Sequence, residues 1–179
     1  MLRSPLARSS TVGALLWMTA AAAAAGDGKL ICEIRENGKP ASGTIVVLHE
    51  STELARATCG KTLSVPVGEH TAVLTLDGAL DAPEQRMAIN AQPDKTVKLG
   101  ADFATGLLEV HITSQGHDTA GMAVIRKDGR QIGTLGSGVS AHLSAGSYEV
   151  VARYRQKERR FDKVSITQGQ RTVLDANFD

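Results

Sequence analysis

Residues 106–112 read Gly-Leu-Leu-Glu-Val-His-Ile, and residues 28–34 read Gly-Lys-Leu-Ile-Cys-Glu-Ile. Every second position from the third onward is apolar in both stretches, which is the pattern of a β-strand with one buried face. We therefore expect two equivalent strands 78 positions apart. Their buried positions are Leu30-Cys32-Ile34 and Leu108-Val110-Ile112, and their more exposed positions are Ile31-Glu33 and Glu109-His111.

The offset of 78 continues through nearly fifty residues, which indicates an internal repeat. The matched residues are mostly glycines and aliphatic residues, among them Gly43 with Gly121, Val46 with Val124, Gly60 with Gly138 and Gly68 with Gly146. After a small length change near residue 80 the match resumes. We place Ile89 beside Ile166, Lys95-Thr96-Val97 beside Arg171-Thr172-Val173, and Phe103 beside Phe178. The chain is thus expected to contain two copies of one unit.

Each copy reads as about seven short strands separated by glycine turns, a pattern typical of a β-sandwich. Asp128-Gly129 is a strong signal for a two-residue hairpin. Alternation further places Ala72-Leu74-Leu76 and Val150-Ala152-Tyr154 inward. The sequence predicts an all-β chain with two tandem seven-stranded Ig-like or prealbumin-like β-sandwich domains, residues 26–103 and 104–179, after a cleaved signal peptide.

The first 25 residues have the three regions of a secretory signal. Arg3 and Arg8 give a positive start, residues 12–25 form a short apolar run, and Ala23-Ala24-Ala25 suits a signal peptidase. An apolar run of this length is shorter than the roughly 20 residues of a membrane-spanning helix. We expect cleavage after Ala25 and a periplasmic or secreted protein with no membrane span after cleavage.

A motif shared by both copies resembles a known family. The second copy has Leu143-x-Ala145-Gly146-x-Tyr148-x-Val150, and the first has residues 65–72, Val-Pro-Val-Gly-Glu-His-Thr-Ala. Both are similar to the L-P-x-G-x-Y-x-V segment of carboxypeptidase-regulatory-like and PEGA-type bacterial sandwich repeats. The first copy keeps the proline, and the second keeps the tyrosine. The resemblance implies exported accessory modules with binding or spacer roles rather than catalytic ones.

Cys32 and Cys59 are the two cysteines of the chain. In folds of this kind, the strand that starts near Lys61 commonly lies beside the first strand, which would bring the two sulfurs together. A disulfide is the favoured interpretation for an exported protein. A buried unpaired Cys32 with a separate Cys59, or a redox pair, are the alternatives. The second copy has Val110 and Ser137 at these positions.

The two copies differ most in charge. Residues 26–103 carry 8 basic and 11 acidic residues, whereas residues 104–179 carry 10 basic and 8 acidic residues. Much of the difference comes from one segment, residues 153–160, which we expect to form a hairpin. Its candidate partner-binding residues are Arg153, Arg155, Lys157, Arg159 and Arg160. The alternative is a solvated hairpin whose charges discourage edge-to-edge pairing of strands.

No sequence motif for catalysis, phosphate binding or a metal site is present in the chain. His111 and His142 share an outward parity, so a weak surface metal site is an alternative to solvent-facing histidines. From Gly26 onward the 18 basic and 19 acidic residues give no general attraction to nucleic acid. We expect no enzyme, cofactor or metal, but a structural or protein-interaction module of the cell envelope with an envelope protein as partner. The alternative is a module that binds an anionic envelope polymer through the hairpin.

Overall fold

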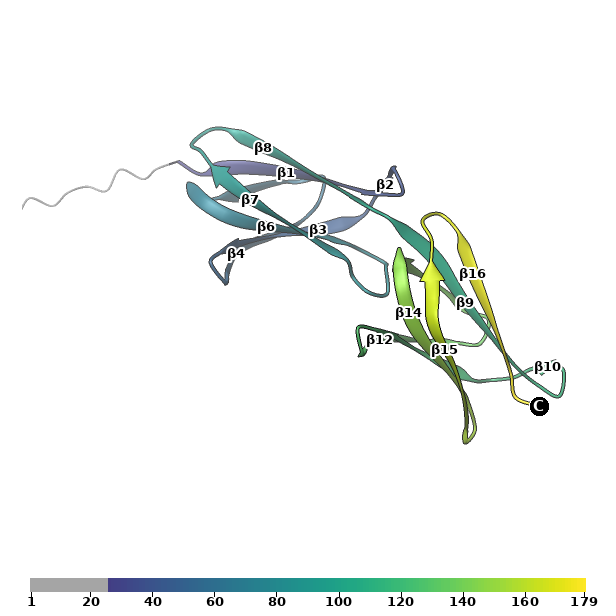
Figure 1. The fold of residues 1–179 in the computed structure, drawn as a ribbon. Coiled ribbons are helices and arrows are strands. Elements are labelled where there is room, and N and C mark those ends of the chain that lie inside the picture. The colour runs from purple at the N-terminus through teal and green to yellow at the C-terminus, as the bar shows by residue number, and fades with distance from the viewer. Residues whose placement is uncertain (1–25) are drawn as a thin grey trace, which may run out of the picture.

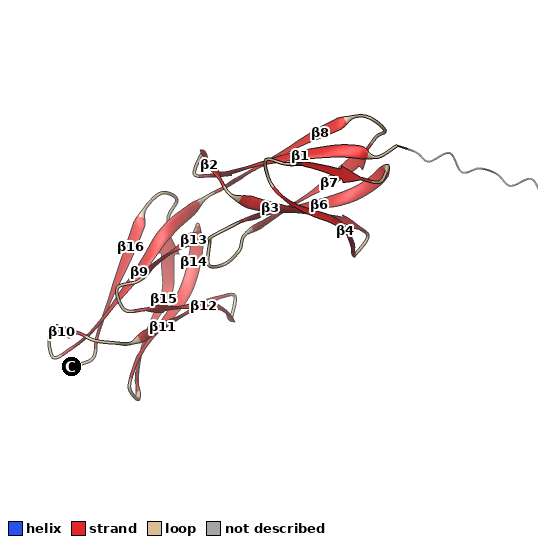
Figure 2. Cartoon of the chain, turned by 180° about the vertical axis from the view of Figure 1, so that it is seen from behind, coloured by secondary structure: helices blue, strands red, loops and turns tan. Residues whose placement is uncertain are grey.

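The computed structural model describes residues 26–179, so the predicted signal peptide at residues 1–25 lies outside the described residues. Every regular element between residues 26 and 179 is a β-strand, as Figure 2 shows. Within this range there is no helix long and apolar enough to cross a membrane. The all-β class predicted from the alternation is therefore confirmed.

The first unit, residues 26–103, contains two four-stranded sheets that face each other. One sheet consists of β1 (Gly28–Glu36), β2 (Lys39–Ala41), β5 (Thr62–Val65) and β8 (Thr96–Phe103). The other has the order β4 (Thr52–Thr58), β3 (Gly43–His49), β6 (Gly68–Leu76) and β7 (Glu84–Ala91). The structure thus adds one short strand, β2, to the seven expected.

The second unit, residues 104–179, repeats this arrangement. Its first sheet consists of β9 (Thr105–Ser114), β10 (His117–Asp118), β13 (Ser140–Ser144) and β16 (Arg171–Asn177). Its second sheet has the order β12 (Arg130–Gly136), β11 (Met122–Lys127), β14 (Gly146–Tyr154) and β15 (Lys157–Ile166). In both units the first strand pairs in parallel with the last, β1 with β8 and β9 with β16. The two sandwiches lie end to end in Figure 1.

Strand pairing corrects the predicted match after residue 80. His70 pairs with Ile89, and its counterpart Tyr148 pairs with Val164, so Ile89 corresponds to Val164 rather than to Ile166. By the same reasoning the parallel pairs shift the match of residues 95–97 with 171–173 by one position. Similar side chains at neighbouring positions made the wrong register look acceptable. From Ile89 onward the offset is 75. The β6–β7 loop, residues 77–83, is five residues longer than the turn between β14 and β15, and β15 is two residues longer than β7.

Each unit has its own core, built from the alternating positions expected. Leu30, Cys32 and Leu108 are fully buried, as are the inward residues of β6 and β14 up to Ala152. Tyr154 is half-buried against Phe178. Some outward positions are buried as well, among them Val73, Val151 and the charged Glu109, of which only 5% is exposed. Arg171 from the neighbouring strand β16 and His111 both contact its carboxylate, which explains how the charge is tolerated there.

Two glycines at matched positions show how closely the units repeat. A Cβ atom on Gly43 would lie 2.5 Å from the Ile34 side chain, and one on Gly121 would lie 2.8 Å from the Ile112 side chain. Only glycine lets the backbone approach the first strand so closely. The expected hairpin at Asp128-Gly129 is also present, with φ of 50° and 76°. These positive values are those that a type I′ turn requires.

The first unit contains a disulfide between Cys32 and Cys59, with Cα atoms 4.9 Å apart. The strand after Lys61, β5, lies antiparallel to β1, as the interpretation of the cysteines assumed. The predicted bridge is confirmed.

Candidate functional site

The junction between the units is the most elaborate polar site of the molecule. Ala104 alone separates β8 from β9, and Thr105, the first residue of β9, is fully buried. The side-chain amide of Asn37 binds Thr105 through both its oxygen and its nitrogen. Its Oδ1 accepts from the Thr105 N–H at 2.9 Å, and its Nδ2 donates to the Thr105 carbonyl oxygen at 3.0 Å. The β1–β2 turn of the first unit therefore holds the start of the second unit.

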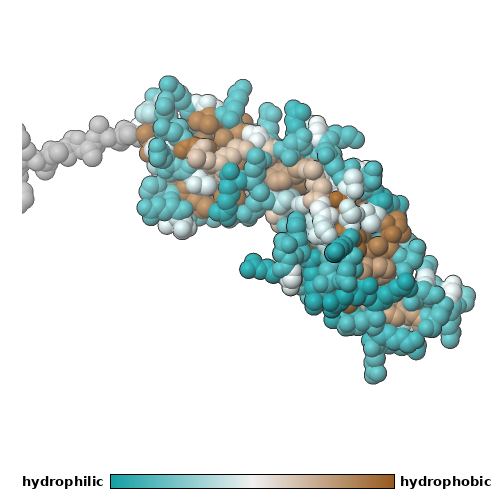
Figure 3. Space-filling view, in the orientation of Figure 1, coloured by the Kyte–Doolittle hydropathy of each residue, from teal (hydrophilic) through white to brown (hydrophobic). Residues whose placement is uncertain are grey.

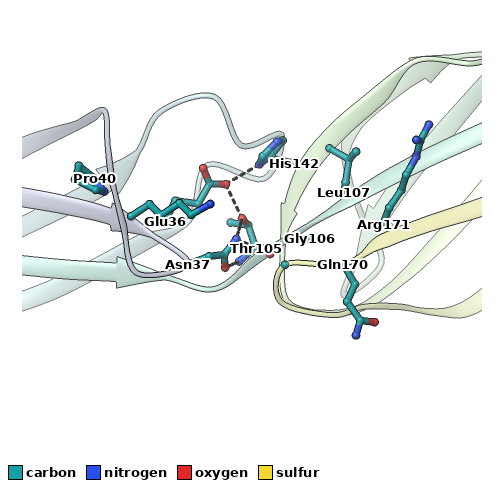
Figure 4. A pocket seen from close by; sticks show the side chains of 11 residues that line it. Glu36, Asn37, Pro40, Thr105, Gly106, Leu107, His142, Gln170 and Arg171 are labelled. Atoms are coloured by element: carbon teal, nitrogen blue, oxygen red, sulfur yellow. Dashed lines mark hydrogen bonds and ion pairs between the residues drawn. The ribbon is translucent and has the colours of Figure 1, made fainter.

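Glu36, beside Asn37, adds a second link. Its Oε1 accepts a hydrogen bond from the Thr105 hydroxyl at 2.5 Å and lies 2.6 Å from Nδ1 of His142 on β13 (Figure 4). Burial raises the pKa of the Glu36 carboxyl, but the hydrogen bonds from Thr105 and His142 outweigh it, so the pKa lies below its usual value. The carboxylate is thus the stable form when the units are docked.

The loop between β6 and β7, residues 77–83, reaches across to the second unit. The Leu80 N–H donates to the His142 carbonyl oxygen at 2.8 Å, and Ala79 forms a parallel bridge with His142. The Leu80 side chain packs against the second core over Gly133. A Cβ on Gly133 would lie 2.5 Å from Leu80, so this close approach requires glycine. The loop contributes an apolar contact as well as backbone hydrogen bonds.

Asp81 is the polar centre of this loop, and its side chain is only 4% exposed. It accepts hydrogen bonds from the Ser144 N–H at 3.1 Å, the Tyr148 hydroxyl at 2.9 Å and the Lys127 ammonium at 3.3 Å. Burial raises the pKa of Asp81, but these donors, Ser144 first, bring it below its usual value. Burial and the Asp81 charge together raise the pKa of Tyr148. In this site Asp81 is ionised and Tyr148 is neutral.

A cavity of about 660 Å³ lies beside these contacts, between the two units. It is lined by residues from both: Glu36, Asn37, Lys39, Pro40, Thr105, Gly106, Leu107, His142, Gly169, Gln170 and Arg171 (Figure 4). Most of its charged groups already have partners, since Glu36 contacts His142 and Arg171 contacts Glu109. The first of these pairs joins the units, and the second lies within the second unit.

The structure brings no metal-binding cluster together in residues 26–179, where no group of three or more His, Cys, Asp or Glu is suitably placed. His111 and His142, the alternative metal ligands considered from the sequence, each contact a different carboxylate. His111 Nε2 lies 2.7 Å from Glu109, whereas His142 is 2.6 Å from Glu36.

The segment 153–160 forms the predicted hairpin, between β14 and β15. Arg155 and Gln156 form its two-residue turn, and Arg155 has φ of 52°. All five candidate residues are exposed: Arg153, Arg155, Lys157, Arg159 and Arg160. Their role in partner binding stays a prediction.

Several of these cations have intramolecular contacts. Arg153 pairs with Glu158 at 2.8 Å, and Arg160 lies 3.6 Å from Glu149. Lys157 donates to the Phe178 carbonyl oxygen at 3.2 Å. The Arg155 guanidinium lies 5.1 Å from the centre of the Tyr154 ring, with solvent around the turn. Arg155 is therefore the cation best placed to contact another molecule.

Sequence reasoning missed the junction residues, although two signals pointed to them. Asp81 falls at the length change near residue 80, which marks a loop that the second unit lacks. Asn37-Gly38 has the composition of a tight turn, although it lies far along the sequence from residues 103–105. Neither signal indicates what the turn or the loop contacts.

Comparison with known proteins gives fold-level similarity only. No protein-family model and no curated protein matches the chain, so the resemblance to carboxypeptidase-regulatory-like and PEGA-type repeats stays a prediction. The chain is similar to the Bacillus anthracis TIE protein, with a TM-score of 0.40, 12% identity and 86% of this chain covered. It spans about a third, 34%, of that protein's length.

Two further solved structures are similar over most of both chains. One is a proposed adhesin from Bacteroides ovatus, with a TM-score of 0.44, 7% identity, and coverage of 86% of this chain and 88% of that chain. The other is the minor pilin GBS52 of Streptococcus agalactiae, with a TM-score of 0.39, 10% identity, and coverage of 85% and 94%. At these values the likeness does not indicate what the chain binds.

Proposed function

We propose that the chain is a non-catalytic protein of the cell envelope, a structural or protein-interaction module that offers the hairpin 153–160 to an envelope protein. The observation that carries this proposal is the junction, where Glu36, Asn37 and Asp81 of the first unit bond to the second. Linked domains move relative to one another unless their interface restrains them. Contacts on both sides of a single linker residue favour one fixed orientation of the two units.

A fixed orientation suits a spacer that holds a binding surface at one end. In Figure 1 the tip of the β14–β15 hairpin lies at the end of the molecule away from the first unit. In Figure 3 this tip projects from the surface and is hydrophilic. Five cations and one acid, Glu158, fall within residues 153–160, which gives the tip a strong positive charge. The hairpin is therefore the surface that we assign to the partner.

Export to the periplasm or the medium is part of the proposal. The Cys32–Cys59 disulfide supports it, because disulfides persist in oxidising compartments and are rare in the cytosol. Recovery of the cleaved chain, beginning near Gly26, from the periplasmic or secreted fraction is the expected result. Recovery of the full-length chain from the cytosol would contradict it.

A non-catalytic role is supported by the pairing of the polar groups. Among the hydrogen bonds of residues 26–179, none joins a serine, threonine or cysteine to a histidine in the manner of an activated nucleophile. Two of the carboxylates with lowered pKa values, Glu36 and Asp81, belong to the junction. The others bond mainly to side chains of their own unit: Glu53 to Arg56, Glu109 to Arg171 and Asp179 to Asn177.

Binding of an anionic polymer is the second candidate, and the excess of cations on the hairpin favours it. The only aromatic residue of the segment 153–160 is Tyr154, which is half-buried. Stacking on sugar rings would therefore contribute little, and charge would dominate. Salt-sensitive retention on an anionic polymer would support this candidate over a protein partner.

Crosslinking in cells from position 156 tests the proposal. The triple variant Arg153→Glu, Arg155→Glu, Arg160→Glu should lose the captured partner while its stability changes by less than about 1 kcal/mol per position, as is usual for exposed charges. A control variant with the same charge change at exposed positions elsewhere is Lys61→Glu, Lys98→Glu, Arg130→Glu. Equal capture by the wild type and both variants would overturn the role of the hairpin.

A further inference from the structure

The far end of the first unit carries the counterpart of the surface that receives Asp81. By the offset of 78, His49 corresponds to Lys127 and His70 to Tyr148. In the second unit, Lys127 and Tyr148 bind the loop 77–83 of the first unit. In the first unit, the same place is an open hollow of about 520 Å³. It is lined by His49, Glu50, Glu69, His70, Thr71, Ala88, Ile89 and Asn90.

The hollow favours a cationic hydrogen-bond donor. Its charged lining consists of Glu50 and Glu69, which are both exposed, and it includes no lysine or arginine. His70 is 8% exposed, and its Nε2 lies 2.8 Å from the Pro66 carbonyl oxygen, to which it donates. Its Nδ1 is then an acceptor, buried and without a partner in residues 26–179. A guanidinium supplies both the charge and the N–H donors that such a site lacks.

The same hollow disfavours an acidic loop such as residues 77–83. In the second unit the Ser144 N–H donates to Asp81. The counterpart of Ser144 is Pro66, which has no N–H to donate. Glu50 and Glu69 would also repel an aspartate. The two surfaces therefore differ in specificity. The surface of the second unit binds an acidic side chain, and the hollow of the first unit favours a basic one.

The basic hairpin lies at the opposite end of the molecule. Figure 1 shows the β3–β4 turn and the start of β6 at one end, and the tip of the β14–β15 hairpin at the other. The tip is the structural counterpart of the loop 77–83, since both connect the third and fourth strands of the second sheet in their unit. It carries Arg155 where the first unit has Asp77.

We propose that copies of this chain associate head to tail, with the hairpin tip of one copy in the hollow of the next. Arg155 of one copy pairs with Glu50 and Glu69 of the other. The inference rests on the proposed function, because it names a second copy as the partner of the same hairpin. Such a head-to-tail dimer has one free hairpin at one end and one free hollow at the other. Further copies can therefore add to both ends and form an open oligomer, unless the geometry closes a ring.

Sedimentation of the purified chain over micromolar to millimolar concentrations tests the proposal. The wild type should form dimers and larger species whose dissociation constant rises with salt. A tip variant, Arg155→Glu with Arg159→Glu, and a hollow variant, Glu50→Lys with Glu69→Lys, should each bind itself about tenfold or more weakly, because like charges then face each other. Mixing the two variants restores opposite charges at every contact and should restore association. All four positions are exposed, so both variants are expected to fold.

A wild type that stays monomeric at every concentration overturns the inference, and so does a mixture of the two variants that fails to associate. The control variant is Lys61→Glu, Lys98→Glu, Arg130→Glu. If it weakens association as much as the tip variant does, the inference is also overturned. Loss of an envelope partner by the tip variant, with a monomeric wild type, would leave the proposed function standing and remove only the second copy as partner.

Discussion

His70 and Tyr148 occupy the same position in the two units and make the same local contact. The His70 ring nitrogen and the Tyr148 hydroxyl each donate to the carbonyl oxygen four residues earlier, of Pro66 and Ser144, at 2.8 Å in both cases. Beyond that contact they differ. The Tyr148 hydroxyl also lies 2.9 Å from the Asp81 carboxylate of the other unit, so its one proton is shared between two acceptors, whereas His70 borders an open hollow. The repeat conserves the internal hydrogen bond of the sandwich and changes what each receiving surface binds.

The disulfide marks a second difference between the units. The Gly60 N–H donates to the Cys32 carbonyl oxygen, and the Gly138 N–H donates to the Val110 carbonyl oxygen, both at 2.9 Å. The backbone is therefore the same with or without the bridge. In the second unit the Ser137 hydroxyl lies 2.8 Å from the Ile112 nitrogen and accepts its N–H. A hydrogen bond takes the place of the covalent link, so the bridge adds stability to a fold that does not require it.

Removal of the disulfide should change the relative stability of the two units more than any other substitution considered. Cys32→Val with Cys59→Ser, which copies the second unit, should lower the free energy of unfolding of the first unit by about 3 kcal/mol, because the unfolded chain loses a crosslink over 27 residues. Peptide-resolved hydrogen exchange should quicken in β1–β8. Both tyrosines, Tyr148 and Tyr154, lie in the second unit, so tyrosine fluorescence reports that unit separately. Equal destabilisation of both units would contradict the prediction.

Much of the fold was predictable because it is encoded locally. The alternation of Leu30-Cys32-Ile34 and the turn at Asp128-Gly129 depend only on adjacent residues. Glu109 was misplaced because Arg171, which pairs with it, comes 62 residues later. The docking of Asp81 could not be predicted, because it depends on the angle between two units that the sequence does not specify. The basic hairpin was recognisable from charge alone, and its role remains a prediction.

Asp81→Asn should weaken the junction by about 2 kcal/mol, the scale of hydrogen bonds to a charged group. The amide keeps the shape but removes the charge that Lys127 and Tyr148 face. We expect the units to unfold in two separate calorimetric transitions rather than in one coupled transition. Asp77→Asn, in the same loop but exposed, is the matched control and should leave the wild-type profile unchanged. Identical profiles for the two variants would contradict the assigned role of Asp81.

Acid should loosen the junction while leaving the two cores intact. The pKa values of Glu36 and Asp81 are lowered in the folded chain. Such groups stabilise the folded state above their unfolded pKa values, near 4, and this contribution is lost as the pH falls through the folded values. Small-angle scattering below about pH 4 should therefore show a wider range of orientations of the units. Glu36→Gln with Asp81→Asn should remove most of this pH dependence, and an unchanged dependence in that variant would contradict the assignment.

Exchange of histidine and tyrosine between positions 70 and 148 should have the smallest effect on stability. It separates the hydrogen bond within each sandwich from the contact between the units. In Tyr148→His the imidazole can still donate to the Ser144 carbonyl oxygen, as His70 does to Pro66, but the contact with Asp81 is lost. A cost of about 1 kcal/mol is expected, the net value of one hydrogen bond. His70→Tyr can keep the bond to Pro66 and removes no contact with the other unit, so its cost should be smaller than that of Tyr148→His. Chemical denaturation of both variants measures the difference. Equal costs would mean that the position serves only its own sandwich, and that the contact of Tyr148 with Asp81 adds nothing to the junction.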